Sequence, residues 1–402
     1  MKNVIAAILA LSLVIALVIY FGLSEKTNLD AKGLSSSGAS SEESLPSGVS
    51  LEQFNDSASW FKTNYPEQPV TREAILLVLA ERATKQSKPE VAVECYDAIS
   101  TTTPKLGLVA RLEQGKLLVA LNQADQAEAA LRAYLEAARV ASELQPQQVQ
   151  DAFKWLTYIL SVEIRQEDRK QILMEQHQIS LADPLDSKQL FFPNLLILNS
   201  PAGKKKIAAF LESDPKNLRL RIANARYRTL EGSYDEAIKL LAPLHQEYPN
   251  DLTVAAALSE AYFENADSAS LKSLLAALPA RSDREPWLLT RMRGESALEN
   301  KQWQVALECF EQVLKNDATN ATAQMGIAKS WAGLGEESKR QVALQRSAII
   351  AEIRVNLSSV QPNAENACYD LAEKCAKLGL DLATESFKQH AKVIAQQNEK
   401  KN

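Results

Sequence analysis

The side chains best suited to binding chemistry are basic, and they crowd into one stretch of the sequence. Residues 204–228 hold eight basic and only two acidic side chains, although the whole chain has a formal charge of -5. The basic residues are Lys204, Lys205, Lys206, Lys216, Arg219, Arg221, Arg226 and Arg228. Arginine suits carboxylate recognition because its planar guanidinium donates two parallel hydrogen bonds. The stretch is therefore a candidate site for acidic groups, with anionic lipid at Lys204–Lys206 and ordinary solvated helix faces as the alternatives.

Residue patterns typical of catalysis or metal binding do not occur in the sequence. The three histidines, His177, His245 and His390, lie in no HExxH motif and near no cysteine pair. Neither a GxSxG motif, a P-loop nor a GxGxxG fingerprint is present. We predict no catalytic residue, no metal and no cofactor. An enzyme whose site is spread over loops is kept as an alternative.

The four cysteines are Cys95, Cys309, Cys368 and Cys375, and they form no CxxC pair. Cys368 and Cys375 are seven residues apart on a predicted helix, a separation of about 10 Å. A disulfide requires Cα atoms closer than that. We interpret all four as small buried residues, which leaves the redox compartment open.

The N-terminal region predicts a membrane anchor. After a tail of residues 1–3, residues 4–23 contain no charged side chain, and a helix of this length spans about 30 Å, the thickness of a bilayer core. Residues 24–50 are rich in Ser and Gly, which predicts a flexible linker. We expect an uncleaved transmembrane helix, with a cleaved signal peptide as the alternative. The rest of the chain is then expected on the periplasmic or extracytoplasmic side.

The composition favours an all-α fold. The chain has 402 residues, only 13 of them glycine, and is rich in Ala, Leu, Glu, Gln and Lys. Apolar residues make up 46% of it, enough for most of the chain to fold. The net negative charge argues against nucleic acid as a partner.

A pattern of small, large and turn-forming residues recurs at intervals of 34 or 35 residues. Its anchor is Ala237 in "YDEAIKLL", with counterparts at Ala92, Ala127, Leu271 and Ala306. Small residues precede the anchors by twelve positions: Ala80, Gly115, Ala225, Ser259 and Gly294. Large apolar residues follow by four: Tyr96, Leu131, Leu241, Leu275 and Phe310. Turn positions precede by five: Ser87, Asn122, Gly232, Ala266 and Lys301. The small residue allows two helices to approach closely, and Gly or Asn at the turn suits a left-handed helix cap.

This pattern resembles the tetratricopeptide repeat (TPR) family, whose units are helix–turn–helix hairpins of about 34 residues. The resemblance implies an all-α, right-handed solenoid over residues 51–402, preceded by the transmembrane helix. The clearest units are 73–106, 108–141, 218–251, 252–286 and 287–320, and weaker units fit at 150–183, 184–217, 321–354 and 363–397. Pro104, Pro215 and Pro249 are expected to follow second helices, because proline cannot continue a helix. A single hairpin cannot bury its own apolar face, so the units must stack.

In this family the first helices line a concave groove that holds peptides or partner helices. Carried onto this sequence, the groove positions include Arg219, Ile222, Arg226 and Thr229, then Ala256, Glu260 and Phe263, then Arg291 and Glu295. We expect Arg219 and Arg226 to bind carboxylates of a protein or peptide partner.

These features together predict a membrane-tethered protein-binding scaffold or adaptor, acting as an assembly or trafficking factor of a cell envelope. A self-associating structural protein is the alternative from another class. The identity of the partner and the oligomeric state are left open.

Overall fold

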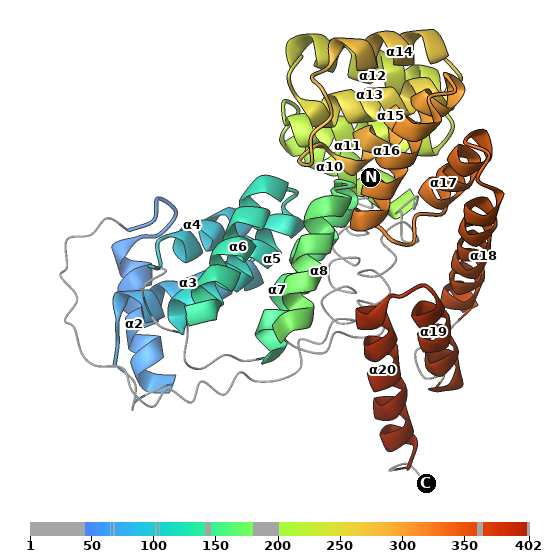
Figure 1. Cartoon of the computed structure of the whole chain (residues 1–402). Helices are drawn as coiled ribbons and strands as arrows, with labels where there is room; N and C mark the ends of the chain where they lie inside the picture. Colours follow the sequence, from blue (N-terminus) through green and yellow to red (C-terminus); the bar gives the residue numbers. More distant parts are fainter. Residues whose placement is uncertain are drawn as a thin grey trace, which may run out of the picture. The chain divides into compact units, whose positions relative to one another are not determined.

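The computed structural model describes residues 45–64, 66, 69–100, 103, 105–140, 146–179, 201–359 and 365–399. Every regular element in these ranges is an α-helix (Figure 1). The predicted transmembrane segment 4–23 lies outside them, as does most of the predicted linker. Of the helices that are described, none has the length and apolar character needed to cross a membrane.

The helices group into two compact units that divide within α7. The first unit holds α2 (Leu51–Asn64), α3 (Arg72–Lys85), α4 (Pro89–Asp97), α5 (Leu106–Ala120), α6 (Ala124–Val140) and the start of α7 (Pro146–Val162). The second unit begins at Leu156. The sequence predicts a single solenoid over residues 51–402, without a division at this point.

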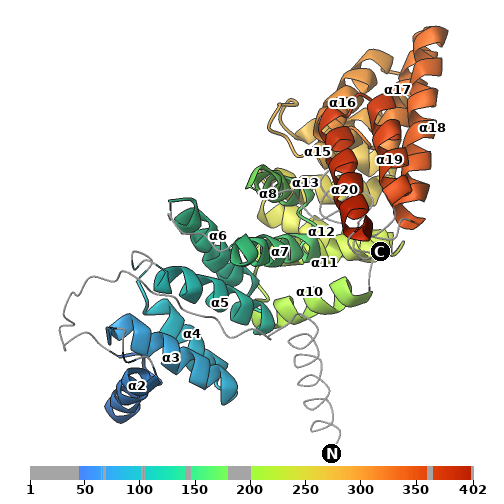
Figure 2. The same ribbon diagram turned by 90° about the horizontal axis from the view of Figure 1, so that it is seen from below.

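The second unit contains a helical hairpin at every position where a repeat was predicted after residue 217. After α8 (Gln166–Ile179) and α10 (Pro201–Ser213), the hairpins are α11 (Leu218–Leu230) with α12 (Tyr234–Glu247), α13 (Leu252–Glu264) with α14 (Ser268–Ala277), α15 (Trp287–Glu299) with α16 (Trp303–Asn316), α17 (Ala321–Gly333) with α18 (Glu337–Ser359), and α19 (Glu365–Lys377) with α20 (Asp381–Glu399). The first helices of successive hairpins contact one another, α11 with α13, α13 with α15 and α15 with α17 (Figure 2). They form a row along this part of the unit.

The predicted unit 150–183 overlaps α7 and α8, and its last four residues lie outside the described ranges. The first half of the predicted unit 184–217 lies outside them as well. Pro215 and Pro249 lie two residues after the last residue of α10 and of α12, as expected of residues that follow helices. Pro104 is not among the described residues.

Eight hairpin turns share one backbone conformation. Each has a residue with positive φ, between 55° and 81°: Ser87, Asn122, Ile164, Gly232, Ala266, Lys301, Gly335 and Gly379. At Gly232 the N–H donates to Thr229 O at 3.0 Å, and the next N–H, of Ser233, donates to Arg228 O at 2.9 Å. The other seven turns repeat this pair of hydrogen bonds, which defines a Schellman motif. All five turn positions predicted from the sequence are therefore confirmed, and three more turns are added.

Close approach is also confirmed at two of the five predicted small positions, Gly115 and Gly294. A Cβ atom added to Gly115 would lie 2.7 Å from the side chain of Leu131, its predicted large partner. A Cβ atom added to Gly294 would lie 3.0 Å from the ring of Phe310, and one added to Gly326, a glycine outside the predicted positions, would lie 2.4 Å from the same ring. Phe310 is fully buried between the helices. Even one methyl group at these glycines requires the neighbouring Leu131 or Phe310 side chain to shift.

The shared turn conformation gives a test of the fold. Lys301 is exposed and has a φ of 58°, where any side chain with a Cβ is strained. We expect Lys301→Gly to raise the free energy of unfolding by about 1 kcal/mol in a urea titration. The matched control is Lys239→Gly, at an exposed position inside α12. It should lower the same quantity by about 1 kcal/mol, and a loss of stability in both variants would contradict the assigned turn.

Candidate functional site

One carboxylate joins three neighbouring first helices. Glu260 of α13 accepts a hydrogen bond from Arg226 Nε of α11 at 3.2 Å and another from Arg291 Nη2 of α15 at 3.1 Å. The Glu260 side chain is only 10% exposed, and the two arginine side chains are 14% and 21% exposed. Charges this poorly hydrated are stable only when paired, so the three side chains hold one another in place.

The spacing of the repeat explains why Arg226 and Glu260 meet, whereas Arg291 lies one helical turn before the equivalent position, Glu295. Arg226, Glu260 and Glu295 each directly follow a small residue of the repeat, at intervals of 34 and 35 residues. Burial raises the pKa of Glu295, while the positive charges of Arg291 and Lys329 act in the opposite direction. Acidic and basic groups therefore continue along the row from α11 to α17. We call the row of α11, α13 and α15 that carries Arg226, Glu260 and Arg291 the inner face.

The predicted groove residues are divided between this face and the protein interior. Arg226, Arg291 and Glu295 are brought together by the row, and Arg219 is exposed at the start of α11. Ile222 instead belongs to the hydrophobic core. Thr229 is buried as well, and its hydroxyl donates to a backbone carbonyl of its own helix. These last two side chains stabilise the stack and are not available to a partner.

Arg226 was expected to bind a partner's carboxylate, but in the structure its partners are within the chain. Besides Glu260, it binds the carbonyl oxygen of Ile164 through Nη1 at 3.1 Å. The same kind of contact occurs elsewhere: Arg111 binds Ile99 O at 3.0 Å, Arg293 binds Pro279 O at 2.7 Å and Arg346 binds Leu378 O at 2.9 Å. All four carbonyls lie one or two residues beyond a helix end, where no intrahelical donor remains. Arginine thus serves repeatedly in this fold as a donor to helix ends.

Residues 162–170, which we call the docked segment, lie against the inner face and the adjoining helix ends. Tyr227 of α11 donates its hydroxyl to Val162 O at 3.2 Å, beside the contact of Arg226 with Ile164 O. The backbone N–H of Trp287, the first residue of α15, donates to Glu167 Oε1 at 2.8 Å. Lys170 Nζ donates to the carbonyl of Asn316, the last residue of α16. The N–H group at the start of α15 and the carbonyl at the end of α16, which have no partner within their own helices, are therefore satisfied by side chains of the docked segment.

The docked segment contains a costly backbone conformation. Ile164 has a φ of 55°, in the left-handed region that β-branched residues rarely adopt, and its side chain is buried. Such a conformation costs of order 1–3 kcal/mol. It persists because the turn is closed by Arg165 N–H donating to Leu160 O at 2.8 Å and because Arg226 binds the Ile164 carbonyl.

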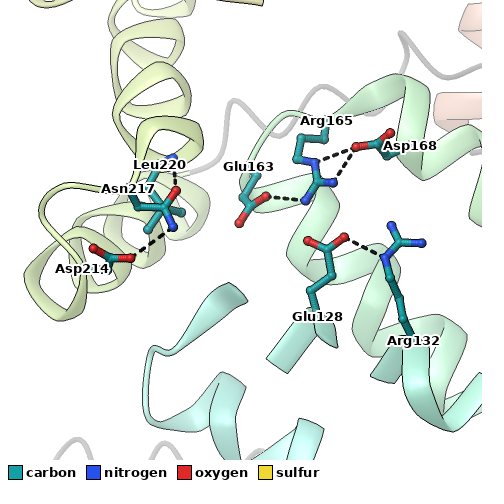
Figure 3. Close-up of polar contacts among 8 residues, drawn as sticks. All are labelled: Glu128, Arg132, Glu163, Arg165, Asp168, Asp214, Asn217 and Leu220. Atoms are coloured by element: carbon teal, nitrogen blue, oxygen red, sulfur yellow. Dashed lines mark hydrogen bonds and ion pairs between the residues drawn. The ribbon is translucent and has the colours of Figure 1, made fainter. Parts of the chain in front are cut away.

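The charges of the docked segment are balanced within it. Arg165 binds Glu163 at 2.9 Å and Asp168 at 2.6 Å (Figure 3). The Glu163 side chain is fully buried, so this pairing is needed to keep a carboxylate there. Glu167, the next acidic residue, is the one that contacts α15.

The basic stretch 204–228 is less positive at the surface than its sequence suggests. Lys204 lies 2.7 Å from Glu231, Arg221 lies 3.4 Å from Glu247, and Arg228 lies 3.7 Å from Glu236. At the start of α11 the cap residue Asn217 accepts from the N–H of Leu220 and donates to Asp214 (Figure 3). Three of the eight basic side chains, Lys204, Arg221 and Arg228, therefore lie beside carboxylates of the same chain, which favours the solvated-face interpretation for these three.

The four cysteines lie in the protein interior. Each of their side chains is buried. Burial raises the pKa of Cys95 to about 11 and of Cys375 to about 12, far above physiological pH. Within the described ranges, no three His, Cys, Asp or Glu side chains are grouped as a metal site requires.

The described helices define an all-α helical-repeat protein. No protein-family model matches the chain, and no curated protein matches it. Among solved structures it is similar to a tetratricopeptide repeat protein from Parabacteroides merdae, at 12% identity over 64% of this chain and 98% of that one, with a TM-score of 0.32. It is similar to MamA, at 14% identity over 44% and 96% of the two chains, with a TM-score of 0.28. It is also similar to human IFIT1, solved as a dimer with PPP-AAAA, at 13% identity over 87% and 82%, with a TM-score of 0.37. Likenesses at these values transfer no ligand or partner to this chain.

The shared carboxylate gives a direct test of the inner face. Glu260→Ala leaves two guanidinium groups close together without a counter-charge, and we expect the free energy of unfolding to fall by on the order of 3 kcal/mol. Glu308→Ala is the control, because that side chain is 48% exposed and lies 3.6 Å from Arg281. Its loss should stay below about 1 kcal/mol. Equal losses in urea titrations of the two variants would contradict the assigned role of Glu260.

Proposed function

We propose that this protein is a scaffold that binds a helix end or peptide of a partner protein on its inner face. The observation that carries the proposal is that this face already holds a segment of polypeptide through its backbone. Arg226 and Tyr227 donate to two main-chain carbonyls, and the start of α15 receives a carboxylate. Contacts with main-chain carbonyls suit many sequences, whereas a carboxylate at a helix N-terminus adds a preference for acidic residues.

The inner face is organised before any partner arrives. Glu260 holds Arg226 and Arg291 in fixed positions, so little side-chain freedom remains to be lost on binding. The Nε–H group of Arg291 is buried and has no acceptor in the described part of the chain. A donor held in place without an acceptor favours binding of a carbonyl or carboxylate oxygen.

The proposal includes a membrane tether formed by residues 4–23. Its support is the uncharged sequence of this segment and the Ser/Gly-rich stretch that follows it. The soluble part then lies on the extracytoplasmic side of the membrane, where the scaffold serves envelope assembly or trafficking. That the protein is not an enzyme stays a prediction from the missing motifs.

The binding role is tested by capturing partners with two charge-reversal variants of the full chain. Arg219→Glu changes an exposed predicted groove residue, and Lys239→Glu makes the same charge change at an exposed position of α12. After crosslinking in the cell's own membranes, we expect wild type and Lys239→Glu to capture the same discrete set of proteins. The captured amount should fall at least fivefold with Arg219→Glu, which corresponds to a loss of about 1 kcal/mol in binding free energy. Identical capture by both variants would contradict binding at the inner face. A wild-type mass that rises with concentration in sedimentation would instead favour the self-associating alternative.

The tether is tested by extracting membranes with alkaline carbonate. We expect the full chain to stay with the membrane pellet and a chain beginning at residue 45 to appear in the supernatant, because only the former carries residues 4–23. The same distribution for both chains would remove the tether from the proposal.

A further inference from the structure

The docked segment occupies the face to which the proposed function assigns a partner. We propose that residues 162–170 are an intramolecular ligand of the inner face, which a partner must displace to bind. This inference rests on the proposed function and adds how binding is controlled and what the partner presents.

The first support is that the docked segment uses the same groups that a partner would need. Arg226 and Tyr227 are engaged by the carbonyls of Ile164 and Val162, and the N–H of Trp287 is engaged by Glu167. A second peptide cannot accept these hydrogen bonds while the segment is in place. Its apparent affinity is therefore the intrinsic affinity multiplied by the fraction of molecules in which the segment is released from the face.

The second support is that the face contacts the segment at a residue whose backbone conformation is unfavourable. Ile164 lies in the left-handed region. Its turn is closed by Arg165 N–H donating to Leu160 O, and Arg226 of the inner face binds the Ile164 carbonyl. An unfavourable conformation that depends on neighbouring structure is typical of segments that change state.

The contacts also define the chemistry of the partner. The face receives the carbonyls at the end of α7, at Val162 and Ile164, and a carboxylate three residues after Ile164. A competing partner segment therefore ends a helix and carries an acidic side chain within about one turn of that end. Its negative charge complements Arg226 and the N-terminus of α15.

Competition can be measured with a labelled peptide that copies residues 156–179. The peptide is titrated into the full chain as wild type and as Glu167→Gln, which removes the carboxylate that contacts Trp287. Asp168→Asn is the matched control, because it removes the same charge from a neighbouring residue whose carboxylate binds Arg165 within the segment. Loss of one charge-assisted hydrogen bond should free the face, so we expect the peptide to bind Glu167→Gln about tenfold more tightly than wild type or Asp168→Asn.

A second peptide shows where the first one binds. A copy of residues 156–179 that itself carries Glu167→Gln should bind the Glu167→Gln chain about tenfold more weakly than the unaltered peptide. Equal affinity of the unaltered peptide for all three chains, or no binding to any, would overturn the intramolecular ligand. A wild-type chain that proves dimeric by exchange of this segment would also overturn it.

These outcomes are separable from those of the capture experiment. Capture that depends on Arg219, without any peptide competition, leaves the scaffold standing and removes the intramolecular ligand. Competition by the peptide without Arg219-dependent capture removes the partner on this face and leaves the docked segment as a contact that only completes the fold.

Discussion

Close approach of two helices at a small residue is the contact on which the rest of the structure depends. Where Gly115, Gly294 and Gly326 leave space, the side chains of Leu131 and Phe310 fill it, and an added Cβ would lie within 3.0 Å of them. The left-handed turn then returns the chain at a fixed angle, with the same pair of hydrogen bonds in eight hairpins. Because both devices recur every 34 or 35 residues, the helices that follow repeat with the same spacing.

The inner face follows from that regularity. The residue one position after the small column is Arg226, Glu260 or Glu295 in three successive hairpins, and Arg226 and Glu260 meet across neighbouring first helices. Their low exposure makes pairing obligatory, so Glu260 is shared by two arginines from the neighbouring helices. The result is a surface whose donors are fixed in place and directed at oxygen atoms, including those of the docked segment.

The sequence predicts well those features that depend on neighbours in the chain. The sequence predicts five turn positions that the structure confirms, because small, large and turn residues keep a constant spacing. Ile164 was not among them, since β-branched residues disfavour the left-handed region and nothing local distinguishes this turn. The partner of Arg226 was also missed. Its contact with Ile164 joins residues 62 apart in sequence, a distance that periodicity does not constrain. The division of the chain within α7 was not predicted either, because the repeat pattern is weak in that part of the sequence.

Native-state hydrogen exchange of the full chain tests most directly whether the inner face holds the docked segment. Tyr227→Phe removes one hydroxyl, which donates to Val162 O, and leaves the buried ring in place. We predict amide exchange about fivefold faster in residues 162–170, the effect of losing a hydrogen bond of about 1 kcal/mol, with little change in α13 to α16. Unchanged exchange in residues 162–170, or an equal increase throughout α11 to α18, would contradict the account.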